Sequence, residues 1–102
     1  MVIIITGTVS LDPAKRDEAI KLGCEHSARS RAEDGCISHN CYVDAEDANR
    51  MHFFEQWRDM DAVKAHFAVP ESGEFVREVA ALASAPPEIA IYAADTIKGA
   101  PF

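Results

Sequence analysis

The stretch from Phe53 to Phe67, read as FFEQWRDMDAVKAHF, constrains the fold most, because it predicts a strand that leads directly into a helix. Side chains alternate with strand periodicity up to Trp57, with aromatic residues on both faces. Asp59 then offers a helix N-cap, and apolar residues recur at helical spacing as far as Phe67. A strand end and a helix start are therefore fixed within a few residues of each other.

Two side chains in this stretch are candidates for a small-molecule site. Trp57, the only Trp of the chain, ends the predicted strand, and His66 lies on the helix that follows. A large aromatic ring beside a titratable imidazole is typical of a ligand pocket. The alternative is that Trp57 fills the core and His66 is an ordinary helix residue. Periodicity alone favours the second interpretation, because pockets are few in any protein.

The other elements complete a βαββαβ order. Strands are predicted over 2–9, 36–44, 50–57 and 88–97, and helices over 13–32, 59–67 and from Glu71 onward, the last two being separated at Pro70. This is the order of the ferredoxin-like α+β fold, a four-stranded antiparallel sheet with its helices on one face. Residues 1–97 are expected to form one domain, and residues 98–102 a loose C-terminal tail.

The predicted strands are apolar on both faces, which a monomer of this fold does not need. In the first strand Val2 and Ile4 oppose Ile3 and Ile5, and the last strand shows the same pattern. With helices on one face only, the other face would be a large exposed apolar patch, which soluble monomers avoid. The sequence therefore predicts a homodimer that packs sheet against sheet with two-fold symmetry.

Charge and hydropathy exclude several classes of partner. The net charge of −7 argues against nucleic acid, since phosphate binding needs a basic surface. No basic amphipathic helix or long apolar run predicts membrane association, and the short apolar run near the N-terminus lacks the features of a signal peptide.

The cysteine pattern indicates a reducing, cytoplasmic setting. Cys24, Cys36 and Cys41 are odd in number and lack CxxC spacing, so neither a disulfide framework nor a structural zinc site is indicated. Strand periodicity places Cys36 and Cys41 on opposite faces. A nucleophilic cysteine is the less favoured alternative to small buried apolar residues.

Small residues mark two places where something approaches the backbone closely. Gly7 within the first strand predicts either a bulge or a close approach. On the first helix Ala19, Gly23 and His26 share one face, which allows close packing on the sheet or leaves room for a ligand. His26 either points into that space or lies on its rim. The remaining charged residues of this helix, including Arg29 and Arg31, are interpreted as solvated surface.

Three segments together resemble the antibiotic biosynthesis monooxygenase domain family. They are SRAEDGCISHNCYV (residues 30–43), FFEQW and DMDAVKAHFAVP. The family pattern has an acidic-Gly-Cys step into the second strand, Glu-x-Trp closing the third strand, and a His nine residues later ahead of a Pro. Glu55, Trp57, His66 and Pro70 match this pattern in type and spacing.

The resemblance implies a dimeric α+β barrel with a pocket between sheet and helices in each subunit. One branch of the family oxidises quinols or polycyclic phenols with O₂ without metal or flavin, because the substrate anion itself reduces oxygen. By that resemblance His66 and Trp57 are the candidate catalytic residues, with no cofactor and no metal, and a small aromatic or quinone-like molecule as substrate. The candidate substrate-binding residues are Phe53, His26, Tyr42, Phe67 and Glu55.

Other branches fit this chain less well. The haem-degrading branch needs an Asn, a Trp and a haem-ligating His at positions that are here Gly7, His66 and about Phe75, so haem degradation is not expected. Another branch isomerises phosphorylated sugar-like ligands. This chain has no evident basic cluster to bind the phosphate, which weighs against that activity. Many quinol-type members have a second His where this chain has Glu71, which predicts a more acidic pocket. The alternative function is a non-catalytic, small-ligand-binding or stress-associated dimer.

Overall fold

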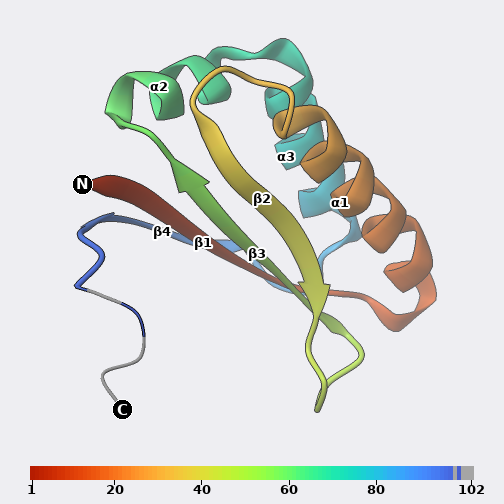
Figure 1. The fold of residues 1–102 in the computed structure, drawn as a ribbon. Helices are drawn as coiled ribbons and strands as arrows, with labels where there is room; N and C mark the ends of the chain where they lie inside the picture. The colour runs from red at the N-terminus through yellow and green to blue at the C-terminus, as the bar shows by residue number, and fades with distance from the viewer. Residues whose placement is uncertain (98, 100–102) are drawn as a thin grey trace.

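The computed structural model describes residues 1–97 and Gly99 (Figure 1). Its elements are, in chain order, β1 (Val2–Ser10), the 3-10 turn η1 (Pro13–Lys15), α1 (Arg16–Ser30), β2 (Cys36–Val43), β3 (Arg50–Trp57), α2 (Met60–Ala68), α3 (Pro70–Leu82) and β4 (Glu88–Ala94). The first helix is shorter than predicted, because a 3-10 turn occupies its start, and β4 ends three residues earlier. The predicted loose tail at 98–102 lies, except for Gly99, outside the described residues.

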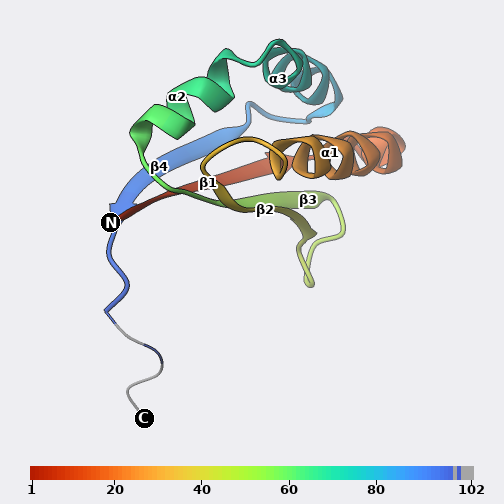
Figure 2. The same ribbon diagram turned by 45° about the horizontal axis from the view of Figure 1, so that its top comes forward.

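The four strands form one antiparallel sheet in the order β2-β3-β1-β4. All three α-helices lie on the same face of this sheet, and no helix of the described residues covers the opposite face (Figure 2). The ferredoxin-like βαββαβ fold with a divided second helix is thus confirmed. Within the described residues no helix is long and apolar enough to cross a membrane.

Local signals explain where the helices begin. The Asp59 side chain accepts a hydrogen bond from the backbone N–H of Ala62 at 2.8 Å and so caps α2. Val69 is extended (φ −66°, ψ 125°) and Pro70 opens α3, because a residue before proline avoids the helical region. Gly35, with φ 82°, turns the chain from α1 into β2, and its added Cβ would lie 2.5 Å from the Ala62 Cβ.

The helix-covered face of the sheet carries two clusters of buried apolar side chains. One cluster lies under α1 and α3 and consists of Val9, Leu11, Ala19, Met51, Phe53 and Val79. The other lies under α2 and consists of Ile3, Ile5, Trp57, Ala62 and Val63. Trp57 is fully buried in the second cluster, where it forms the base beneath α2.

A β-bulge corrects one prediction for β2. The pairing with β3 shifts between Cys36 and Ser38, so that Cys36 pairs with Trp57 and Cys41 pairs with Phe53. Both partners face the helices, and the two cysteines therefore share that face instead of lying on opposite ones. Strict alternation fails because the bulge inserts an additional residue, Ile37, whose side chain is exposed.

The uncovered face of the sheet carries large apolar side chains. Phe54, Tyr42 and Tyr92 project from β3, β2 and β4 on this side and are all exposed in the single chain. Val2 and Ile4 of β1 lie between them and are partly covered. The pattern that predicts a partner surface is therefore present on the folded chain.

Gly23 allows α1 to approach the sheet closely. An added Cβ would lie 2.9 Å from Met51 Sδ, 3.0 Å from Cys41 Sγ and 3.1 Å from Phe53 Cζ. These separations are shorter than ordinary contacts, so a side chain at this position would push the helix outward. The close-packing interpretation of the small residues on this helix is confirmed.

We expect Gly23→Ala to lower the free energy of unfolding by about 1 kcal/mol or more, because overpacking costs ~1–3 kcal/mol and exceeds the gain in helix propensity. Gly73→Ala on α3 is the matched control. Its Cβ would meet only Arg77 Nη1, at 3.5 Å, so this change should stabilise by up to about 1 kcal/mol. Urea unfolding followed by circular dichroism measures both. Equal stabilisation by the two substitutions would contradict the packing argument.

Candidate functional site

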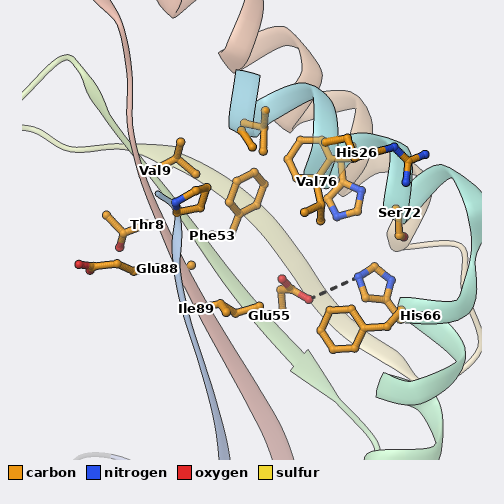
Figure 3. A pocket seen from close by; sticks show the side chains of 18 residues that line it. Thr8, Val9, His26, Phe53, Glu55, His66, Ser72, Val76, Glu88 and Ile89 are labelled. Atoms are coloured by element: carbon orange, nitrogen blue, oxygen red, sulfur yellow. Dashed lines mark ion pairs between the residues drawn. The ribbon is translucent and has the colours of Figure 1, made fainter. Parts of the chain in front are cut away.

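A pocket of about 530 Å³ lies between the sheet and the helices (Figure 3). Its floor includes Gly7 and Phe53, and its walls include Phe67 and Val76 from α2 and α3. The rim is open to solvent, because Val76 and Ile89 are both exposed. A volume of this size suits a small-molecule ligand of a few fused or substituted rings.

Gly7 contributes to this pocket by the absence of a side chain. It pairs in regular register with Phe53 on one side and Ile89 on the other, so β1 has no bulge there. Of the two predicted explanations for Gly7, the structure therefore favours an open approach to the backbone from the pocket.

The polar end of the pocket is built around three buried imidazoles. His26 of α1, His39 of β2 and His66 of α2 each offer a ring nitrogen, and these atoms lie within 4.8 Å of one another. The ring centroids are 5.0 Å apart for His26 and His39, 5.5 Å for His26 and His66, and 5.6 Å for His39 and His66. His26 and His66 line the pocket, whereas His39 lies behind them in the protein.

Glu55 places a carboxylate among these imidazoles. It is 7% exposed, and its Oε1 accepts a hydrogen bond from the Trp57 indole N–H at 2.9 Å. The same oxygen lies 3.3 Å from His39 Nε2 and 3.9 Å from His66 Nε2. Figure 3 shows Glu55 pointing from the sheet toward His66. Glu55 is therefore a buried strand residue whose carboxylate is surrounded by polar side chains.

The Nδ1 atoms of two imidazoles have partners on the side away from Glu55. His66 Nδ1 lies 2.9 Å from Glu33 Oε1, and His39 Nδ1 lies 2.8 Å from Ser27 Oγ. An ionised Glu33 carboxylate can only accept a hydrogen bond, so it takes the hydrogen of His66 Nδ1, and His66 Nε2 faces Glu55. Trp57 also holds His66, because the centroids of the two rings are 4.5 Å apart.

His26 is held in its neutral form. Burial, followed by electrostatic interaction with His39, His66 and Arg29, lowers the pKa of His26 from 6.5 to about 3. Arg29 Nη2 donates to His26 Nδ1 at 2.9 Å, so the remaining ring nitrogen carries the hydrogen. The ring stacks on Phe75 with centroids 4.0 Å apart. His26 is therefore a hydrogen-bond donor at the pocket surface.

The structure brings most of the candidate residues to this pocket. His66, Phe53, His26, Phe67 and Glu55 line it. The two others lie elsewhere. Trp57 is fully buried beneath His66 and reaches the pocket only through Glu55, and Tyr42 is 52% exposed on the opposite face of the sheet.

Some of the residues that shape the site have no evident signal in the sequence. Glu33 contacts His66 across 33 positions of the chain. Arg29, interpreted as solvated surface, has a buried Nε and donates to His26. Arg31 is exposed, but its Nε donates to the backbone carbonyl of His39 at 2.9 Å. Its assignment to a purely solvated surface is likewise wrong.

At the start of α3 the pocket is lined by a different residue from the one that the resemblance indicates. Glu71 is exposed and does not line the pocket, so the expected acidic pocket at that position is not present. The next residue, Ser72, is buried in the lining, and its hydroxyl has no hydrogen-bond partner within the described residues. A ligand hydroxyl or carbonyl is the kind of group that Ser72 can bind.

The thiols of Cys36 and Cys41 are poorly suited to act as nucleophiles. Burial raises the pKa of Cys41 to about 12, and burial also raises the pKa of Cys36. Only a thiolate attacks efficiently, so both residues serve as small packing groups.

The neutral state of His26 predicts a pH dependence of stability. Because the folded pKa lies below the unfolded value, the unfolded chain takes up a proton below about pH 6.5 that the folded chain does not. The free energy of unfolding should therefore fall as the pH decreases from about 6.5 toward 3, by at most ~1.4 kcal/mol per unit. His26→Phe keeps an aromatic ring against Phe75 and should flatten this slope. Urea unfolding between about pH 7 and pH 4 measures this slope for both proteins. Equal slopes in the wild type and in His26→Phe would contradict the assignment of His26 as neutral.

Comparison with known proteins places the chain in a family. The sequence profile described as antibiotic biosynthesis monooxygenase matches residues 2–78. The uncharacterized protein sll1783 of Synechocystis is 39% identical over 90 residues, which cover 88% of this chain and 61% of that protein. The chain thus spans less than two thirds of that relative. The Bacillus subtilis protein YcnE, described as a candidate monooxygenase, is 26% identical over 85% of this chain and 92% of its own length.

Solved structures show the same fold. A protein from Deinococcus radiodurans, titled a candidate antibiotic biosynthesis monooxygenase, has a TM-score of 0.91 at 21% identity, covering 96% of this chain and 97% of its own. Rv0793 from Mycobacterium tuberculosis has a TM-score of 0.87 at 23% identity, covering 96% and 100%. At this identity the likeness establishes the fold, and the profile match establishes the kinship. The chain belongs to the antibiotic biosynthesis monooxygenase family.

Proposed function

We propose that this protein is a monooxygenase that oxidises a small phenol- or quinol-type aromatic with O₂ in the pocket between sheet and helices. The observation that carries the proposal is the division of the pocket into an apolar slot and a polar end. Phe53, Phe67, Phe75 and Val76 supply the slot, and the buried polar groups converge at its inner end. A flat aromatic ring with one or two hydroxyls matches this division.

The reaction takes its electrons from the substrate. Loss of a proton from an activated phenol gives an anion that adds O₂ at a ring carbon and forms a C–O bond and a hydroperoxide. Loss of water from the hydroperoxide leaves a carbonyl on the ring, with one oxygen atom in the product and one in the water. All four electrons come from the substrate, so no external reductant or flavin is required. The protein binds the substrate, excludes water from it and removes its proton.

The residues divide into those that contact the substrate and those that position them. His66 and Glu55 form the end of the pocket where the hydroxyl is oriented and loses its proton. His26 donates a hydrogen bond to a developing oxygen anion. Trp57 acts as a positioning residue, because its indole N–H fixes the Glu55 carboxylate and its ring supports His66.

The exposed apolar sheet face supports a homodimer as the working form. Phe54, Tyr42 and Tyr92 present aromatic rings on a face that no described element covers. A second copy packed on this face by two-fold symmetry would remove them from water. The cytoplasmic setting is likewise a proposal, supported by the three free cysteines.

We expect oxygen uptake above the rate of spontaneous autoxidation with at least one member of a panel of quinols and polycyclic phenols. His66→Ala should reduce kcat on that substrate by about 10²–10⁴-fold, because the proton acceptor at the end of the pocket is lost. Trp57→Phe keeps the core filled but removes the indole donor to Glu55, and should lower kcat less. An oxygen electrode measures all three proteins.

Tyr42→Phe is the matched control, because Tyr42 lies on the opposite face of the sheet and should not affect turnover. Turnover that survives His66→Ala would contradict the assigned site. Binding of a metabolite in a thermal-shift screen without any oxygen consumption would favour the non-catalytic, ligand-binding alternative.

We expect the wild-type chain to be a dimer at micromolar concentration in size-exclusion chromatography with light scattering. Phe54→Asp places a charge in the middle of the proposed interface and should shift the protein to monomers. Met60→Asp is the control, since Met60 is exposed to a similar degree at the start of α2, away from the sheet face. A stable wild-type monomer would overturn the proposed assembly.

A further inference from the structure

We propose that His39 Nε2, His66 Nε2 and Glu55 Oε1 bind a divalent first-row transition-metal ion at the inner end of the pocket. Two imidazoles and one carboxylate, brought together from three elements, are a set of ligands that Zn²⁺ and Fe²⁺ use in enzymes, with further positions left open. The family resemblance implies chemistry without a metal, so this site would be an addition to it. It concerns the residues of the proposed active site, but does not rest on the oxidation being correct.

The separations are close to those of a coordination sphere. Ligand atoms about 2.0–2.2 Å from one ion lie roughly 2.9–3.4 Å from each other. Glu55 Oε1 is 3.3 Å from His39 Nε2 and 3.9 Å from His66 Nε2. Each of the three histidines has a ring nitrogen within 4.8 Å of a ring nitrogen of the others, so ligands at that separation would have to close by about 2 Å at most to share one ion.

The orientation of His39 distinguishes this arrangement from a simple ion pair. His39 is fully buried, and its Nε2 lies 3.3 Å from Glu55 Oε1, yet it makes no hydrogen bond within the described residues. A hydrogen-bonded pair would point directly at each other. Two ligands of one metal lie equally close but point at a third position between them. A buried polar nitrogen without a partner is otherwise costly, and an ion at that position satisfies it.

The outer contacts prepare both imidazoles as ligands. A metal-bound histidine normally gives its other N–H to a carboxylate or another acceptor. His66 Nδ1 has the Glu33 carboxylate at 2.9 Å, and His39 Nδ1 has the Ser27 hydroxyl at 2.8 Å. Metal binding requires the hydrogen of each ring on Nδ1, and these two contacts accommodate that arrangement. Both Nε2 atoms would then offer a lone pair toward the position beside Glu55 Oε1.

His26 has a different role from the other two imidazoles. Arg29 Nη2 can only donate, so its hydrogen bond to His26 Nδ1 places the ring hydrogen on Nε2. A nitrogen that carries hydrogen is not a metal ligand. His26 is therefore assigned as a donor beside the ion, toward the pocket that it lines. The nearby charges are balanced, because Glu33 and Glu55 together offset the ion, and Arg29 lies beyond His26.

The ion would define how a phenol loses its proton. An ion held by His39, His66 and Glu55 would supply a Lewis acid and a bound hydroxide, which would take the phenol proton and leave as water. The electrons for O₂ would still come from the substrate. His66 would then hold the ion instead of accepting the proton itself, and His66→Ala would lower turnover through loss of the ion.

The direct test needs no substrate. Protein without an affinity tag is treated with EDTA, dialysed, and titrated with Co²⁺ while the visible d–d absorption is recorded. We expect one Co²⁺ per chain, its displacement by Zn²⁺, and an increase in Tm with either ion, because an ion that binds only the folded state stabilises it. Absence of binding and of any thermal shift at micromolar protein and metal would overturn the proposal, and would leave the oxidation to be judged by oxygen uptake alone.

Variants test the ligand set. His39→Gln and Glu55→Gln should each weaken Co²⁺ binding by more than about 100-fold, and Glu33→Gln by about 10-fold, as expected for a group that orients a ligand. His52→Gln is the matched control, because His52 lies on the opposite face of the sheet and should bind as wild type does. Binding unchanged in His39→Gln would overturn the site. His26→Gln should retain binding, and its loss there would overturn the assignment of His26 as a donor. Circular dichroism verifies that each variant is folded.

Discussion

Glu55 places a carboxylate on the helix-covered face of the sheet, where it is 7% exposed and surrounded by groups that meet its charge. A buried, unpaired carboxylate costs several kcal/mol of stability, so its partners must come with it. The indole N–H of Trp57 is the direct partner at 2.9 Å, and His39 and His66 approach the same oxygen. These three come from β3, β2 and α2, so the carboxylate ties three elements into one site. The rest of the polar end of the pocket is arranged around this contact.

The turn from β3 into α2 makes that arrangement possible. Trp57 ends the strand, Asp59 caps the helix within two residues, and His66 is then carried back over the Trp57 ring at 4.5 Å. A longer connection would allow α2 to move relative to the strand end. Because the indole contacts both Glu55 and His66, its position sets the distance between the carboxylate and the imidazole. The tryptophan is therefore important to the site without reaching the pocket.

Local signals predict the frame of this protein well. The alternation from Arg50 to Trp57 gives the bounds of β3, and the Asp59 cap and Pro70 give the division of the second helix. Residues whose partners are distant in the sequence were not predictable in the same way. Glu33 looks like a polar residue after a helix, and its contact with His66 follows only from the way the turn after α1 lies against α2 in the folded chain. The bulge at Ile37 has no local signal either, and it alone reverses the facing of Cys36.

The histidine cluster departs from what stability alone would select. Burial first, and then the neighbouring imidazoles and Arg29, disfavour protonation of His26 and lower its pKa to about 3. Apolar side chains of similar volume would fill the same space without an orphaned His39 Nε2 or a buried Arg29 Nε. Such costs concentrate at functional sites, where a polar arrangement is kept for what it binds. Within the described residues four buried side-chain atoms have no hydrogen-bond partner, and each belongs to a residue that lines the pocket or lies against one that does: Arg29 Nε, Glu33 Oε2, His39 Nε2 and Ser72 Oγ. The cost is therefore located where a ligand or an ion would offset it.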